Sequence, residues 1–158
     1  MLSVSGLQGQ LVENPDFEKT IKELISNQVP IITVKQLQDD TAYHLFLDAR
    51  EIEEFNVSHI PNARYVGYDN FGIDDVDDLD KDTPIVIYCS IGYRSDRIGG
   101  QLKKAGFTNV SNLFGSIFEW ANVGLPMVDK NNKTTKRLHT YNKRWSQWVD
   151  NPKIEKIW

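Results

Sequence analysis

Short apolar segments of the length of β-strands alternate with helix-like segments along most of this chain. Five apolar segments are candidate strands, at residues 31–34, 43–47, 65–66, 85–88 and 110–113. Helix-like segments or helical turns stand between or after them, at residues 34–38, 51–55, 94–105 and 115–122. This alternation predicts an α/β fold, in which about five mainly parallel strands form a sheet with helices on both faces.

One domain with extensions at both ends is expected for a chain of 158 residues. Residues 1–30 form an N-terminal extension in which Asn14 is a candidate N-cap and Pro15 stands in the first turn. These residues predict an amphipathic helix over residues 15–27. Residues 31–129 hold the alternating segments.

The C-terminal segment, residues 130–158, differs from the rest of the chain in charge. The chain has a net charge of −4, with 18 Lys and Arg against 22 Asp and Glu, and this segment is basic while the body is acidic. Four apolar residues in it follow helical spacing: Leu138, Tyr141, Trp145 and Trp148. The pattern predicts an amphipathic helix docked on the domain, against the N-terminal helix. The alternatives are a homodimer or partner contact through this segment, or binding to RNA or a membrane surface; the acidic body argues against nucleic acid.

Cys89 is the only cysteine of the chain, and it stands between a candidate strand and a candidate helix. The apolar residues 84–88 end at it, and a helix-like stretch follows after a short loop. At such a position the backbone N–H groups and the dipole of the following helix favour an anion and lower the pKa of a thiol. A buried, unreactive cysteine is the alternative, but Gly92, Arg94 and Ser95 just after Cys89 favour a nucleophile.

A second polar loop, from Asp48 to Arg50, follows the candidate strand at residues 43–47. The carboxyl ends of parallel strands meet at one edge of a sheet, where sites are commonly built. We therefore expect this loop to lie near the loop of Cys89.

Several classes of protein are not expected from this sequence. One cysteine excludes an internal disulfide, which is compatible with a reducing compartment. Residues 1–10 have neither the basic nor the apolar region of a signal peptide, and no apolar stretch approaches membrane-spanning length, so we expect a cytoplasmic protein without a membrane span. The three histidines, His44, His59 and His139, do not stand at ligand spacings, and we expect no metal and no cofactor.

Residues 31–129 resemble a single rhodanese domain, the domain of a sulfurtransferase family. The matching motifs stand in the family's order along the chain: Leu47-Asp48-Ala49-Arg50, Glu54-Phe55, His59-Ile60 with Ala63, Tyr88-Cys89 with Gly92, Arg94 and Ser95, Leu102, Gly106-Phe107 with Val110 and Leu113, Gly115 with Trp120, and Gly124 with Pro126. Ser116 stands where the family has a second glycine. The resemblance implies a five-stranded parallel sheet flanked by helices.

The resemblance also implies a reaction at Cys89. The thiol would take a sulfane sulfur from a small donor such as thiosulfate, become a persulfide, and pass the sulfur to a thiol or to cyanide. A protein is a further candidate as sulfur donor or acceptor. An alternative is a non-catalytic rhodanese-like module that binds or regulates a partner, and an oxidation sensor would lack a resolving cysteine.

The residues of the loop are suited to an anionic persulfide. The N–H groups of residues 90–95 can point inward as a cradle, and Gly92 permits the turn that this needs. Arg94 supplies a fixed positive charge. The hydroxyl groups of Ser90 and Ser95 offer further donors, and Ser95 is also a candidate N-cap of the helix.

Other residues are expected to frame this loop. Ile91 and Tyr93 would form the rim of the pocket, or else be exposed loop side chains. Asp48 and Arg50 would form a pair that holds the loops in register, with a direct catalytic role as the alternative. His59 would stabilise a turn, with a role as general base as the alternative.

The length of the loop separates this chain from related phosphatases. Four residues stand between Cys89 and Arg94. The cell-cycle phosphatases that are related to rhodanese have one residue more, which makes a wider cradle. The shorter loop suits a sulfur atom better than a phosphate group.

Overall fold

The computed structural model describes residues 9–158. Residues 1–8 lie outside the described part of the chain, and with them most of the segment on which the absence of a signal peptide was predicted.

Five parallel strands form the central sheet, in the order β1-β5-β4-β2-β3. The strands are β1 (Ile31–Thr33), β2 (Leu45–Asp48), β3 (Arg64–Tyr65), β4 (Ile85–Tyr88) and β5 (Val110–Phe114). Strand β4 lies in the middle of the sheet, and its four residues are all buried. The α/β fold with a five-stranded parallel sheet, predicted from the alternating segments, is confirmed.

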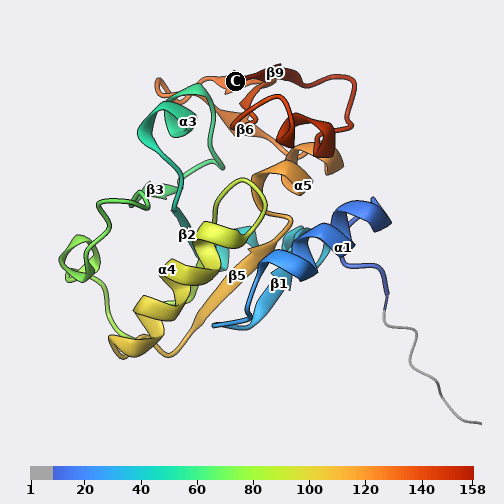
Figure 1. Cartoon of the computed structure of the whole chain (residues 1–158). Coiled ribbons are helices and arrows are strands. Elements are labelled where there is room, and N and C mark those ends of the chain that lie inside the picture. The colour runs from blue at the N-terminus through green and yellow to red at the C-terminus, as the bar shows by residue number, and fades with distance from the viewer. Residues whose placement is uncertain (1–8) are drawn as a thin grey trace, which may run out of the picture.

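Helices cover both faces of this sheet (Figure 1). They are α1 (Pro15–Leu24), α2 (Val34–Leu37), α3 (Ile52–Val57), α4 (Tyr93–Lys104) and α5 (Ser116–Val123), with short 3-10 helices at Thr41–Tyr43 and Ile73–Val76. Because successive side chains of a strand point to opposite faces, Val86 and Tyr88 of β4 join one core with α1, α2 and α5, while Ile85 and Ile87 join a second core with α4.

Helix α1 begins where the sequence predicts and ends earlier. The side chain of Asn14 accepts hydrogen bonds from the N–H groups of the first turn, as an N-cap does. The helix ends at Leu24 rather than near residue 27, because Ile25 is extended and N–H groups beyond it bind another element. Those of Ser26 and Gln28 donate to the carboxylate of Asp96 in α4, at 3.0 and 2.9 Å.

The C-terminal segment does not form the predicted α-helix. It forms β7 (Thr134–Thr135), which pairs with β6 (Met127–Val128) just before the segment, β8 (Arg137–His139) paired with β9 (Glu155–Ile157), and one 3-10 turn at Trp145–Trp148. Tyr141 has a φ of +67°, in the left-handed region, which ends any helix that would run from Leu138 to the tryptophans. The helical spacing of the apolar residues was therefore misleading, and strand pairing decided the local structure.

This segment packs on the domain through apolar side chains. Leu138, Val149 and Ile154 are buried in the same core as α1. The ring of Trp148 stacks on that of Phe17 in α1, with ring centroids 5.4 Å apart. Figure 1 shows the segment along the top of the molecule, between α3 and α1. A homodimer through this segment stays a prediction.

Within residues 9–158, no helix has the length and apolar character needed to cross a membrane.

Candidate active site

Cys89 stands at the carboxyl end of the central strand, where the chain turns into helix α4. Gly92 makes this turn with a φ of +129°, a conformation that a residue with a side chain rarely adopts. The N–H of Gly92 points back and donates to Sγ of Cys89 at 3.2 Å. The hydroxyl oxygen of Ser95, in the first turn of α4, lies 3.5 Å from the same sulfur. The loop therefore places the N–H of Gly92 on the sulfur and holds the side chain of Ser95 beside it.

Opposing effects act on the pKa of the Cys89 thiol. The side chain is buried, and burial raises the pKa of a thiol. The positive charge of Arg94 and the hydrogen bonds from Ser95 and Gly92 lower it, and together they outweigh burial. The pKa of Cys89 lies below its ordinary value, so the thiolate forms more readily than that of a free cysteine.

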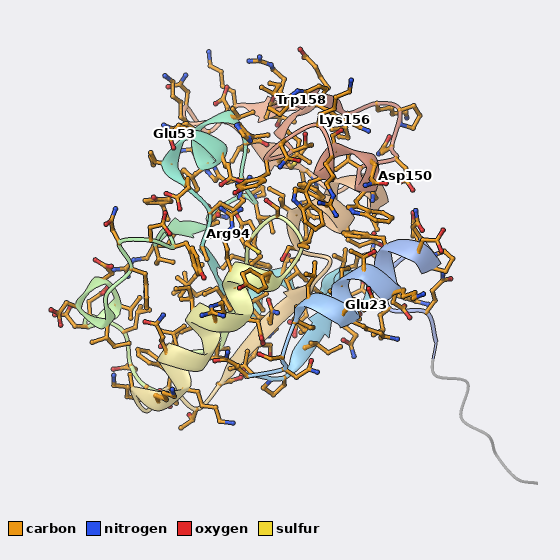
Figure 2. All side chains as sticks on the ribbon, in the orientation of Figure 1. Glu23, Glu53, Arg94, Asp150, Lys156 and Trp158 are labelled. Carbon is orange, nitrogen blue, oxygen red and sulfur yellow. The ribbon has the colours of Figure 1, made fainter. Side chains whose placement is uncertain are left out.

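The guanidinium of Arg94 is paired with the carboxylate of Glu54, a residue of the Glu54-Phe55 motif. Its two terminal nitrogens donate to the carboxylate oxygens of Glu54 in α3, at 2.8 and 2.9 Å. Arg94 lies at the amino end of α4 and faces the upper part of the molecule (Figure 2). Arg94 was expected to offer its charge to a substrate, but in the structure it shares that charge with Glu54.

Glu54 is nearly fully buried. Burial raises its pKa, but the hydrogen bonds and the charge of Arg94 lower it more, so that the pKa lies below the ordinary value. Its carboxylate also accepts from the N–H of Glu51, which places the group in the first turn of α3. The pair thus joins α3 to the loop of Cys89.

The hydroxyl groups of Ser90 and Ser95 are engaged differently from what the sequence suggested. Ser90 donates to Glu54 at 3.2 Å and accepts from Arg94 at 3.0 Å, so it supports the ion pair rather than the sulfur. Ser95 is not the N-cap of α4, since Gly92 holds that position. Its hydroxyl donates to the side-chain oxygen of Asn112 in β5 at 2.6 Å.

Asn112 and Ser116 hold the loop from behind. The side-chain nitrogen of Asn112 donates to the carbonyl of Gly92 at 3.0 Å. The hydroxyl of Ser116 accepts from the backbone N–H of Cys89 at 3.1 Å and donates to the carbonyl of Leu113 at 2.9 Å. The residue that replaces the family's second glycine therefore anchors the backbone of Cys89 itself.

A pocket of about 420 Å³ opens beside Cys89. Ile91 and Tyr93 line it, as expected from their place in the loop. Tyr68 and Asp69, in the segment after β3, also line the pocket. Residues outside the motif also contribute: Leu24 of α1, Glu51 before α3, and Tyr141 and Trp145 of the C-terminal segment.

Asp48 and Arg50 form an ion pair that is fully buried, and neither lines the pocket. A terminal nitrogen of Arg50 lies 2.7 Å from the carboxylate of Asp48 and also donates to the carbonyl of Ser58. These contacts tie the end of β2 to the end of α3. They support the interpretation that the pair holds loops in register.

His59 also lies away from the pocket lining. Its Nδ1 is 3.0 Å from the carbonyl oxygen of Phe55, and its ring stacks on the ring of Phe55. Its backbone pairs with Val128 of β6. These contacts fit a residue that stabilises a turn, and they do not bring its ring nitrogens to Cys89.

Sequence reasoning did not assign roles to Glu54, Asn112, Tyr141 or Trp145 in this site. Glu54 and Arg94 are 40 positions apart, so no local spacing indicates their pairing. Asn112 offered one signal, because an amide in the middle of an apolar strand needs buried hydrogen-bond partners. The helical spacing of Tyr141 and Trp145 in the C-terminal segment predicts the apolar face of a helix instead.

The Arg94→Gln variant is expected to raise the pKa of Cys89. The variant removes the cation that favours the thiolate, and it leaves the carboxylate of Glu54 without its partner. Because less thiolate is then present at neutral pH, alkylation by iodoacetamide at pH 7 should slow by about tenfold. The measurement is the alkylation rate from pH 5 to pH 10, whose midpoint should move upward.

A double variant, Glu54→Gln with Arg94→Gln, is the matched control. It removes both charges, so the unpaired Glu54 carboxylate no longer contributes. Its midpoint should also lie above that of the unchanged protein. If both midpoints stay where they are, Arg94 does not set the pKa of Cys89.

The comparisons with known proteins agree with this architecture. The family model of the rhodanese-like domain matches residues 31–123, more than half of the chain. A sulfurtransferase of Allochromatium vinosum is 33% identical over 102 residues, which cover 65% of this chain and 94% of that protein. A solved structure, the polysulfide-sulfur transferase homodimer of Wolinella succinogenes, has a TM-score of 0.54 at 20% identity and covers 73% of this chain and 88% of its own.

Another relative contains a similar domain within a longer protein. A tRNA uridine(34) hydroxylase of Pectobacterium atrosepticum is 34% identical over 93 residues, which cover 52% of this chain but only 26% of that protein. The sulfurtransferase of Allochromatium vinosum, in contrast, is covered almost completely. The family-model match and this coverage have one consequence: the chain belongs to the rhodanese-like domain family, a family of sulfurtransferase-type enzymes.

Proposed function

We propose that this protein is a sulfurtransferase that carries a sulfane sulfur as a persulfide on Cys89. The observation that carries the proposal is the environment of Sγ, which accepts a hydrogen bond from the N–H of Gly92 and lies near the cation of Arg94. This donor and this charge favour the thiolate that must attack, and they suit the anionic sulfur that results.

The loading step uses thiosulfate as the donor. The thiolate of Cys89 attacks the outer sulfur of thiosulfate, and the S–S bond of the donor breaks. The electron pair of that bond leaves with sulfite. The product is a persulfide anion on Cys89, so the total charge of the reactants and products is the same.

The second step passes the outer sulfur to an acceptor. The sulfur of an acceptor thiol, or the carbon of cyanide, attacks the outer sulfur of the persulfide. The bond between the two sulfurs breaks, and its electron pair returns to Cys89 as the thiolate. With a thiol, the proton of the acceptor ends on the transferred sulfur; with cyanide, the product is thiocyanate.

Incubation with thiosulfate is expected to add the mass of one sulfur atom to the folded protein, on the peptide that contains Cys89. The measurement is the intact mass followed by peptide mapping. The control is the same chain unfolded in urea, where the thiol is present but the donors around it are dispersed; it should gain little sulfur in the same time.

A folded protein that gains no sulfur, or gains it equally when unfolded, would contradict the proposal. That result would favour the alternative of a non-catalytic module that binds a partner.

A further inference from the structure

Four aromatic side chains line the pocket beside Cys89, and two of them come from outside the family match. Tyr68 and Tyr93 belong to the matched residues 31–123. Tyr141 and Trp145 belong to the C-terminal segment. This segment therefore supplies part of the lining of the pocket beside Cys89.

The backbone holds Tyr141 and Trp145 in place. Next to Tyr141, the fully buried Thr140 donates its N–H to the carbonyl of Ile157 at 2.7 Å. The N–H of Tyr141 donates to Nδ1 of His139 at 3.1 Å, and that of Trp145 donates to the side chain of Asn142 at 3.0 Å. Hydrogen bonds of the backbone therefore fix the positions of the two residues in the C-terminal segment.

Tyr141 reaches the site directly. The guanidinium of Arg94 lies over its ring, 5.5 Å from the ring centroid. The residue adopts a φ of +67°, which is unfavourable for a tyrosine. The residue is 54% exposed, so burial in the core does not account for its conformation.

The charges of the pocket do not favour an anionic acceptor. Arg94, the cation of the lining, already binds Glu54 through both terminal nitrogens. Glu51 and Asp69 add two carboxylates to the wall, and burial together with Asp69 raises the pKa of Glu51. What the pocket offers a ligand is chiefly aromatic and apolar surface.

We infer that the sulfur acceptor is a small organic thiol with an aromatic or apolar body, and that Tyr141 and Trp145 determine this specificity. The inference rests on the proposed function, because it concerns the second step at Cys89. The volume of about 420 Å³ is in the range that holds one small organic molecule. Aromatic side chains contribute binding energy to such a ligand by stacking as well as by burial.

The transfer balances without a further reactant. The thiol of the acceptor attacks the outer sulfur of the Cys89 persulfide, and the bond between the two sulfurs of the persulfide breaks. Its electron pair returns to Cys89 as the thiolate. The acceptor leaves as an organic persulfide that carries the proton of its former thiol.

The test compares three thiols on protein that has already been loaded with sulfur. Phenylmethanethiol has an aromatic body, 2-mercaptoethanol is small and neutral, and glutathione is anionic. The measurement is the rate at which the added sulfur is lost from the intact mass. Phenylmethanethiol is expected to react at least about tenfold faster than either of the others.

Two variants test the role of the C-terminal segment. In Tyr141→Ala and in Trp145→Ala, the ratio of the phenylmethanethiol rate to the 2-mercaptoethanol rate should fall toward one, while Tyr141→Phe should retain it. The ratio is used because both thiols meet the same Cys89 persulfide, so a change in the reactivity of that sulfur cancels. Tyr141 is exposed, so its variant should fold even if removal of Trp145 destabilises the domain.

Trp158→Ala is the matched control, since Trp158 is an exposed tryptophan of the same segment that does not line the pocket. Its ratio should equal that of the unchanged protein. Equal rates for the three thiols, a preference for glutathione, or an unchanged ratio in Tyr141→Ala would overturn the inference. A protein that cannot be loaded at all would instead contradict the proposed function.

Discussion

The Cys89→Ser variant is expected to lose sulfur transfer by a factor of about 10³ or more. Serine keeps nearly the same shape and the same hydrogen-bond environment, but its hydroxyl does not ionise in the accessible pH range and cannot carry a sulfane sulfur. Removal of a covalent nucleophile typically costs an enzyme at least this much. The measurement is the rate of thiocyanate formation from thiosulfate and cyanide.

The control for this variant is its stability. Cys89 is buried, but its sulfur receives only hydrogen bonds that a hydroxyl oxygen can also accept. The melting temperature of the Cys89→Ser variant should therefore remain close to that of the unchanged protein. Thiocyanate formation above about one hundredth of the original rate, in a variant that is folded, would show that Cys89 is not the carrier.

The Arg50→Met variant is expected to lower the free energy of unfolding by about 3–5 kcal/mol. Arg50 and Asp48 are both fully buried, and removal of the guanidinium leaves the carboxylate of Asp48 without its partner. Burial lowers the pKa of Arg50, but the charge of Asp48 raises it above its ordinary value, so the arginine remains charged in the folded protein. The measurement is equilibrium unfolding in urea.

The matched control is the double variant Asp48→Leu with Arg50→Met. It removes both charges and replaces them with apolar side chains, so no unpaired charge stays buried, and a large part of the lost stability should return. A loss below about 1 kcal/mol in the single variant would show that the pair does not hold these loops. Sulfur loading of the folded fraction should continue in the double variant, because neither residue lines the pocket.

The fold was predictable because its signals are local. The stretch at residues 85–88 is short and contains no charged residue, which predicts a buried strand of the sheet. The capping side chain of Asn14 sets the start of α1. The end of α1 was not predictable. It depends on the carboxylate of Asp96, some 70 positions away, which binds the backbone after the helix.

The C-terminal segment shows how a local pattern can mislead. Leu138, Trp145 and Trp148 follow a helical period, but each of them serves a different tertiary contact. Leu138 is buried in the core, Trp148 stacks on Phe17, and Trp145 lines the pocket. The pairing of β8 with β9 satisfies the backbone around Leu138, and Trp145 and Trp148 lie in a separate 3-10 turn.

The sequence by itself determined the sheet and the position of Cys89 at the carboxyl end of a buried strand. Strand periodicity, a turn glycine and a following helix act within a few residues of one another. Only the tertiary structure decided where the charges and aromatic rings lie. Glu54 pairs with Arg94, Asn112 and Ser116 hold the loop, and Tyr141 lines the pocket over Arg94. These contacts join segments far apart in the chain, and their geometry exists only once the whole core has packed.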